Sequence, residues 1–482
     1  MIFLHLDFRQ TYYMLDSTAF IPMARFYLFI LKNKSMRFIV NTLFLIFFSQ
    51  TLLAQKDTVR MSLDDCINYA VENGYNTNMQ KSRTKDSEID YKQAIMNHLP
   101  SISGSVGIET AFGRGIDPET NSYINQSSLS NGYNITGNIP IFQGFSLFNQ
   151  TRRAKISKLR GESELVKVKD EIAIKTILAF AEAIYNRELV VLSEQMVEKY
   201  SLELKKATRR LELGAGSKAD LMQIQAGLSQ EKLTLIKAEN LFEISIIKLK
   251  EIMSFPLAEH LSLVKDENQT LQMTLNPGQT VEEILEIALD SNPKAVISKQ
   301  TLEVEKLSLS IAKGNYYPSL SLSGGVNSAF FRSLDSKPFS SYNSQIRNNL
   351  GEWVGLSLSI PIFNRNERRT NVKLAKNNLE RAILTHKNES RILESEIRQC
   401  FMELDACRQA MEQSLLNVEY HKLANEAISK RFEKGASSLI ELQTSDANLF
   451  RAEVESRNAS LKYQIKIREI NYYKGQKLWI EK

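Results

Sequence analysis

The cysteines and histidines are the residues best suited to ligate a metal or act as nucleophiles, and their spacing favours neither role. The 482-residue chain has three cysteines, Cys66, Cys400 and Cys407, and five histidines. Neither a CxxC pair nor an HExxH motif occurs among them, and zinc or redox sites are typically marked by such spacings. Cys400 and Cys407 lie seven residues apart in a helical pattern, which separates them by about 10 Å, beyond the reach of a disulfide. We expect buried or tolerated thiols.

Glycine and charge patterns also argue against catalysis and nucleic-acid binding. Gly104, Gly107, Gly113 and Gly115 fall in or after a predicted strand that no helix follows, whereas a phosphate-binding loop opens a helix. The formal net charge is only +6, and the basic residues alternate with glutamates as on solvated helix faces. We therefore expect no enzyme, no cofactor, no metal and no nucleic-acid partner.

The N-terminal region has the form of a targeting signal. Met36-Arg37 precedes an apolar run over 38–48, and Ala54 follows as a small residue at a cleavage position. This pattern predicts a secretory signal peptide cleaved after Ala54, and the apolar run is short for a membrane anchor. We expect translation to start at Met36, with residues 1–35 as an upstream extension and no lipid anchor on the mature chain.

The remaining chain is an internal repeat. Three pairs of matching segments recur in the same order with an offset of 218 to 221 residues, and they centre on Pro100 and Pro318, Pro140 and Pro361, and Gly214 and Gly435. This self-similarity divides the chain into two structural copies. We place the first copy at 55–253, a linker at 254–280, the second copy at 281–474 and a tail at 475–482.

Each copy is predicted to contain a helix, a β-hairpin, a very long helix and a further helix. The helices are expected at 63–97, 146–213 and 219–253, and again at 281–315, 366–434 and 440–474. At 1.5 Å per residue the long helices span roughly 100 Å, more than the thickness of a globular core. The two shorter helices of each copy sum to the length of the long one. We therefore expect them to stack end to end alongside it.

Apolar spacing in the long helices predicts helix–helix seams. In the second long helix the apolar positions follow alternating steps of four and three, as in a coiled coil, at Leu393, Ile397, Cys400, Leu404 and Cys407. The first long helix has two adjacent rows with a period of seven, one at Ile177, Ile184 and Val191 and the other at Leu178, Tyr185 and Leu192. Two rows fit a helix with partners on two sides, as in a closed ring. An ordinary bundle with a wide apolar stripe fits the same pattern.

The segments 101–142 and 319–363 switch to a period of two, which predicts two hairpins. In the first strand Ile102, Val106 and Ile108 alternate with serine, glycine and Glu109, so one face is apolar and the other small and polar, as for lipid outside and water inside. Each strand is expected to be about 10 residues, enough to cross a bilayer when tilted, with polar loops at 113–130 and 332–350. Four strands leave open edges that lipid does not tolerate. Other copies must complete the sheet, and three copies would give twelve strands and an open lumen.

The ordered set of motifs resembles the TolC-like outer membrane efflux protein family over about residues 60–475. The motifs are Pro100-Ser101 and Pro318-Ser319, Ile139-Pro140-Ile141-Phe142 and Ile360-Pro361-Ile362-Phe363, and the two glycine turns. The resemblance implies an α+β membrane protein in the outer membrane: a homotrimer with a twelve-stranded β-barrel, four strands per protomer, continued by an α-helical coiled-coil barrel in the periplasm. It also implies contact with outer-membrane lipid, a periplasmic adaptor protein and an inner-membrane pump, in a tripartite efflux or type I secretion system. A periplasmic coiled-coil scaffold without a pore is the alternative.

The resemblance also suggests functional positions. Gly214, Gly216, Gly435 and Ser437 would form the periplasmic helix-turn tips, and Pro100, Pro140, Pro318 and Pro361 would mark the transitions between barrel and helices. Asp220 and Glu441 would place acidic groups at a periplasmic aperture, because such rings attract cations. Acids near a helix start equally stabilise the helix dipole. Where the family has a further acid, this chain has Gln223 and Thr444.

Overall fold

The computed structural model describes residues 59–116, 121–264, 280–335 and 340–480. The predicted signal peptide, its cleavage position and the proposed start at Met36 lie outside these ranges, as does most of the predicted linker. The chain divides into two units. One comprises residues up to Arg60 with Ala258–Ser262, and the other comprises Met61–Leu257 with Leu263–Lys482. β1 (Val59–Met61) and β4 (Leu261–Leu263) form a two-stranded sheet.

No helix in the described ranges combines the length and the apolar character that crossing a membrane requires.

The larger unit contains the two repeats, whose helices match closely in length. The first set is α3 (Leu63–Asn73), α4 (Tyr75–Met96), β2 (Ser101–Ile116), β3 (Tyr123–Gln143), α5 (Ser146–Glu212) and α6 (Lys218–Met253). The second set is α8 (Val281–Ser291), α9 (Pro293–Gly314), β5 (Ser319–Ser333), α10 (Tyr342–Asn348), β6 (Gly351–Ser359), α11 (Glu367–Glu433) and α12 (Leu439–Tyr473). α5 and α11 each have 67 residues, α4 and α9 each 22, and α3 and α8 each 11.

The prediction of one continuous helix over 63–97 and over 281–315 is wrong, because each stretch is two helices. In the second repeat the break lies at Asn292, whose backbone is extended (ψ 127°), as expected for a residue that precedes a proline. Pro293 then begins α9, at a position where proline costs the helix nothing. In the first repeat the break lies at Gly74, where a Cβ atom would stand 2.4 Å from the Ala70 carbonyl oxygen.

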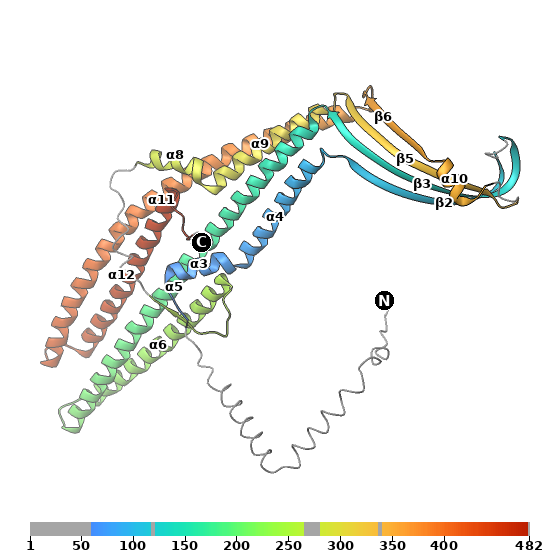
Figure 1. Ribbon diagram of the computed structural model, residues 1–482. Helices are drawn as coiled ribbons and strands as arrows, with labels where there is room; N and C mark the ends of the chain where they lie inside the picture. The colour runs from blue at the N-terminus through green and yellow to red at the C-terminus, as the bar shows by residue number, and fades with distance from the viewer. Residues whose placement is uncertain (1–58, 117–120, 265–279, 336–339, 481–482) are drawn as a thin grey trace, which may run out of the picture. The chain divides into compact units, whose positions relative to one another are not determined.

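The shorter helices pack along the long one in each repeat. α3, α4 and α6 contact α5, and α8, α9 and α12 contact α11; in Figure 1 α4 and α6 lie along opposite ends of α5. α5 also contacts α9 and α12, so it joins the two repeats. This arrangement matches the end-to-end stacking that the helix lengths predict.

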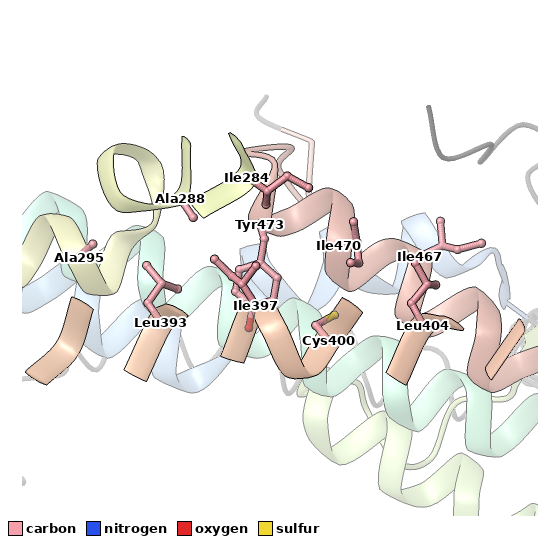
Figure 2. Close-up of a cluster of buried hydrophobic side chains, with 10 residues drawn as sticks. All are labelled: Ile284, Ala288, Ala295, Leu393, Ile397, Cys400, Leu404, Ile467, Ile470 and Tyr473. Atoms are coloured by element: carbon pink, nitrogen blue, oxygen red, sulfur yellow. The ribbon is translucent and has the colours of Figure 1, made fainter. Parts of the chain in front are cut away.

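A continuous apolar core holds α8, α9, α11 and α12 together (Figure 2). Its residues are Ile284, Ala288, Ala295, Leu393, Ile397, Cys400, Leu404, Ile467, Ile470 and Tyr473. The first four positions of the predicted seam in α11 are therefore buried, while Cys407 is half-buried. Burying one such aliphatic side chain stabilises the fold by about 1.5–3 kcal/mol. In α5 Ile177 and Ile184 are buried within the single chain, whereas Val191 is exposed.

The four remaining strands form one antiparallel sheet in the order β2-β3-β5-β6, and they lie side by side in Figure 1. Pairing of β3 with β5 joins the two repeats, and β2 and β6 are the edges. The strands have 16, 21, 15 and 9 residues. The prediction of about 10 residues each is confirmed for β6 and wrong for the other three strands. The predicted loop at 113–130 is wrong because most of its described polar residues continue the ladder. The segment 332–350 contains α10. The predicted α+β class, with a four-stranded sheet continued by long duplicated helices, is confirmed.

Candidate functional site

The turn from α5 to α6 is closed by a glycine in the left-handed region. Gly214 has φ +76°, a conformation that residues with a Cβ rarely adopt. Its N–H donates to the Leu211 carbonyl at 3.0 Å, and the Ala215 N–H donates to the Arg210 carbonyl at 2.9 Å. These two bonds satisfy the last carbonyls of α5 in a Schellman motif. α6 starts only six residues after α5 ends, so the two helices run antiparallel.

The turn from α11 to α12 repeats this geometry. Gly435 has φ +73°, its N–H donates to the Phe432 carbonyl at 2.9 Å, and the Ala436 N–H donates to the Arg431 carbonyl at 2.8 Å. The turns differ at two positions, where Leu213 and Gly216 in the first correspond to Lys434 and Ser437 in the second. The Ser437 hydroxyl donates to the Glu441 carboxylate.

Asp220 and Glu441 both lie exposed in the first turn of a helix, α6 and α12 respectively. The Glu441 N–H donates to the Ser438 hydroxyl oxygen at 3.2 Å. Hydrogen bonds from the Ser437 hydroxyl and the Ser438 N–H hold the pKa of Glu441 below its usual value. Glu441 therefore does contribute to the start of α12. This role is compatible with one at an aperture, since the carboxylate stays charged and exposed.

One turn further along, two glutamines connect the helices of the two repeats. The side-chain amide of Gln223 in α6 donates to the Gln443 side chain of α12 at 3.2 Å. This position, where the resemblance implies a further acid, therefore carries a neutral contact between the repeats.

Three of the four predicted transition prolines lie between elements. Pro100 precedes β2, Pro318 precedes β5, and Pro361 lies between β6 and α11. Pro140 does not mark a transition, because β3 continues to Gln143. The register of β3 on β5 shifts between Pro140 and Phe142, and such an irregularity tolerates a residue that lacks an N–H.

The strand-to-helix turns are made by residues that sequence reasoning missed. Gly144 and Phe145 lead into α5 with φ +57° and +59°, and Arg365 and Asn366 lead into α11 with φ +53° and +68°. A Cβ on Gly144 would stand 2.1 Å from the Gly314 carbonyl oxygen. The only signal was the recurrence of these turns 221 residues apart, because three of the four residues have a Cβ.

A buried cluster of polar side chains connects α5 with α11 and α12 of the second repeat. The ammonium of Lys199 lies 2.6 Å from Asp446, which is buried on α12. The Asn425 side chain of α11 donates to the same carboxylate at 2.5 Å and to Ser445 at 3.2 Å. These polar residues occur singly and form no repeating pattern in the sequence. Sequence analysis therefore did not identify them.

The last described residues fold back onto α5. The indole N–H of Trp479 donates to the Asp170 carboxylate at 2.8 Å, and both side chains are buried. The ammonium groups of Lys169 and Lys477 lie 4.1 and 5.2 Å from the centre of the indole ring. Burial raises the pKa of Asp170, although the hydrogen bonds from Trp479 and Tyr472 oppose this.

Metal-ligating side chains are dispersed: in the part of the chain that the structure describes, no three His, Cys, Asp or Glu residues gather into a possible metal site.

Comparison with known proteins identifies this architecture. Residues 284–474, which span almost the whole second repeat, match the family model of outer membrane efflux proteins. The second repeat is therefore similar to outer membrane efflux proteins. The helices of the first repeat have closely similar lengths 218 to 221 residues earlier, so both halves of the chain share one helical plan.

The individual proteins that the chain resembles are distant in sequence. It is 18% identical over 359 residues to the alkaline protease secretion protein AprF of Pseudomonas aeruginosa, an alignment that covers 74% of this chain and 71% of the relative. The crystal structure of CusC matches with a TM-score of 0.73 at 13% identity, covering 86% of this chain and 92% of CusC. The CmeC outer membrane channel of Campylobacter jejuni matches with a TM-score of 0.70 at 18% identity, covering 86% and 85%. At these identities the structures establish the fold.

Proposed function

We propose that the chain is one protomer of a homotrimeric outer-membrane channel that serves as a passive exit duct of a tripartite efflux or type I secretion system. Three copies would close a twelve-stranded barrel in the outer membrane and continue it as a helical tunnel into the periplasm. The duct performs no chemistry. Its energy comes from an inner-membrane pump, which it meets through a periplasmic adaptor protein.

The observation that carries this proposal is the unfinished sheet. β2 and β6 are its two edges, and β2 is 16 residues long. A long edge strand with open N–H and C=O groups is a template for pairing with another chain. In a membrane such groups must be paired, because each unsatisfied one costs several kcal/mol. Pairing β2 of one copy with β6 of the next would close the sheet over the nine residues of β6.

The sheet also has a face suited to lipid. Cross-strand register places apolar residues of all four strands on the same side, and these side chains are largely exposed in a single chain. Examples are Ile102, Val106, Ile108, Ile135 and Val354, of which Val354 is 81% exposed. A continuous exposed apolar surface indicates a membrane or protein contact, and the opposite face is small and polar, as in the lumen of a barrel.

The long helices have unfilled apolar positions as well. Leu178 and Val191 of α5 belong to the two predicted rows, and they are 49% and 47% exposed. In a trimer these positions can pack against a helix of the neighbouring copy. The helix-turn ends would then gather at the periplasmic mouth, where Asp220 and Glu441 supply six carboxylates from three copies and meet the adaptor protein.

Conductance tests the proposal against a scaffold that has no pore. Purified protein in detergent is added to a planar lipid bilayer, and the current is recorded in KCl. We expect stepwise increases of uniform size, each from one inserted trimer. A matched preparation of denatured protein controls for detergent leakage. Protein that assembles correctly, yet gives no steps over background, would favour the scaffold.

A further inference from the structure

The small, polar face of the sheet is almost free of charge. Direct cross-strand partners share a face, and one row across the sheet is Ser105, Asn134, Asn327 and Gly351. A second row contains Ser103 and Thr136, whose hydroxyl oxygens are 3.1 Å apart. Most positions on this face carry a hydroxyl, an amide or glycine, and the register also places Phe331 and Trp353 there. Among the described residues of β2, β3, β5 and β6 it has one charged side chain, Glu109.

Glu109 projects from this face without an ionic partner. It is exposed and lies directly opposite Ser130 of β3, which in turn lies opposite Phe331 of β5. In the described chain no lysine or arginine nitrogen comes within 4.0 Å of its carboxylate. The other charged residues of the described strands lie on the apolar face: Arg114 on β2, Arg332 on β5 and Glu352 on β6.

We propose that Glu109 sets the ion preference of the barrel part of the channel. This inference rests on the proposed function, in which the polar face lines the lumen. Each copy then contributes one carboxylate at the same level, and three copies make an acidic ring in a wall that is otherwise neutral. Rings of carboxylates favour the passage of cations over anions. The same-face neighbours of Glu109 are the uncharged residues Gly107, Ser130 and Phe331, so the wall beside the ring does not oppose this field.

The reach of such a ring depends on salt. The Debye length is about 30 Å at 0.01 M, 10 Å at 0.1 M and 3 Å at 1 M ionic strength. In a lumen wide enough for open passage, three carboxylates at the wall therefore influence ions across the pore only in dilute salt. The cation preference that Glu109 produces should be largest near 0.01 M KCl and should vanish near 1 M.

The test measures reversal potentials of single channels in a planar bilayer under a KCl gradient. Asp220→Asn and Glu441→Gln are present in every variant, so the periplasmic acids do not contribute. In this background we expect Glu109→Gln to shift the potassium-to-chloride permeability ratio toward 1 in dilute salt. Glu109→Lys should invert the sign of the reversal potential. Unchanged step conductance at 1 M KCl shows that each variant is folded and inserted.

Glu352→Gln is the matched control, since it removes the same charge from the opposite face of the same sheet. It should leave the permeability ratio where it was. An unchanged ratio in Glu109→Gln, or an equal shift in both variants, would overturn the inference while the channel itself stands. Absence of any conductance in the unmodified protein would instead refute the proposed function on which the inference rests.

Discussion

Loss of the bond between Trp479 and Asp170 should release the last residues of the chain from α5. The indole N–H donates to the carboxylate at 2.8 Å, and each residue is only 5% exposed. A buried hydrogen bond to a charged group contributes about 1.5–3 kcal/mol. At 1.4 kcal/mol per factor of ten, Asp170→Ala should raise the detached fraction of the tail by roughly 10- to 150-fold.

Tryptophan fluorescence reports this release directly. The chain has two tryptophans, so Trp353→Phe leaves Trp479 as the single fluorophore. In that background the emission should be blue-shifted and protected from acrylamide, and Asp170→Ala should increase quenching. Asp170→Asn is the matched control, because it keeps an oxygen acceptor for the indole and should preserve protection. Equal quenching with and without the carboxylate would refute the reasoning.

The same bond should depend on pH with a defined sign. Burial raises the pKa of Asp170 in the folded chain, although the hydrogen bonds from Trp479 and Tyr472 oppose this. The contribution of Asp170 to folding stability should therefore be largest below about pH 4, near the ordinary pKa of aspartate, and should decline as pH rises through the raised value. Asp170→Asn should abolish this part of the pH dependence of the thermal transition. A contribution that grows with rising pH would contradict the assignment.

Three further predictions follow from single residues. Ile397 is fully buried, so Ile397→Ala should lower the free energy of unfolding by about 2–5 kcal/mol. The thermal transition should then occur at a lower temperature. An unchanged transition would contradict the assignment of Ile397 to the core. Gly435 has φ +73° with open space around it, so Gly435→Ala should strain only the backbone, by about 1–2 kcal/mol. Amide hydrogen exchange at the turn should become faster. Unaltered exchange would contradict the predicted backbone strain. Burial raises the pKa of Cys66 and of Cys400 to about 12, so at pH 8 iodoacetamide should modify at most Cys407. Intact-mass spectrometry of the folded protein measures the number of adducts. A second adduct would contradict the burial of Cys66 and Cys400.

Sequence periodicity predicts the long helices well because their apolar rows persist over many turns. α5 spans Ser146–Glu212 against the predicted 146–213, and α11 spans Glu367–Glu433 against 366–434. Apolar periodicity does not reveal the helix breaks at Gly74 and Asn292, because a helix resumes after one residue in each case. Strand length was missed for a related reason: serine and asparagine in β2 and β3 have the composition of loops, yet their backbone groups pair in the ladder.

Sequence analysis could predict residues of the candidate site only where the backbone conformation requires a particular residue type. Positive φ requires Gly214 and Gly435, and the repeat marks both. The bond between Asp170 and Trp479 joins residues 309 positions apart, and the pairing of Lys199 with Asp446 joins residues 247 apart. Neither pair has a local signature, because tertiary packing alone brings its members together.

The central claim is that the four-stranded sheet is completed by sister copies. Native mass spectrometry of the purified mature protein in detergent tests this most directly. The account predicts one dominant species with three times the mass of the mature chain, which separates only when the detergent complex is denatured. A folded species with the mass of a single chain, stable in buffer without detergent, would contradict it.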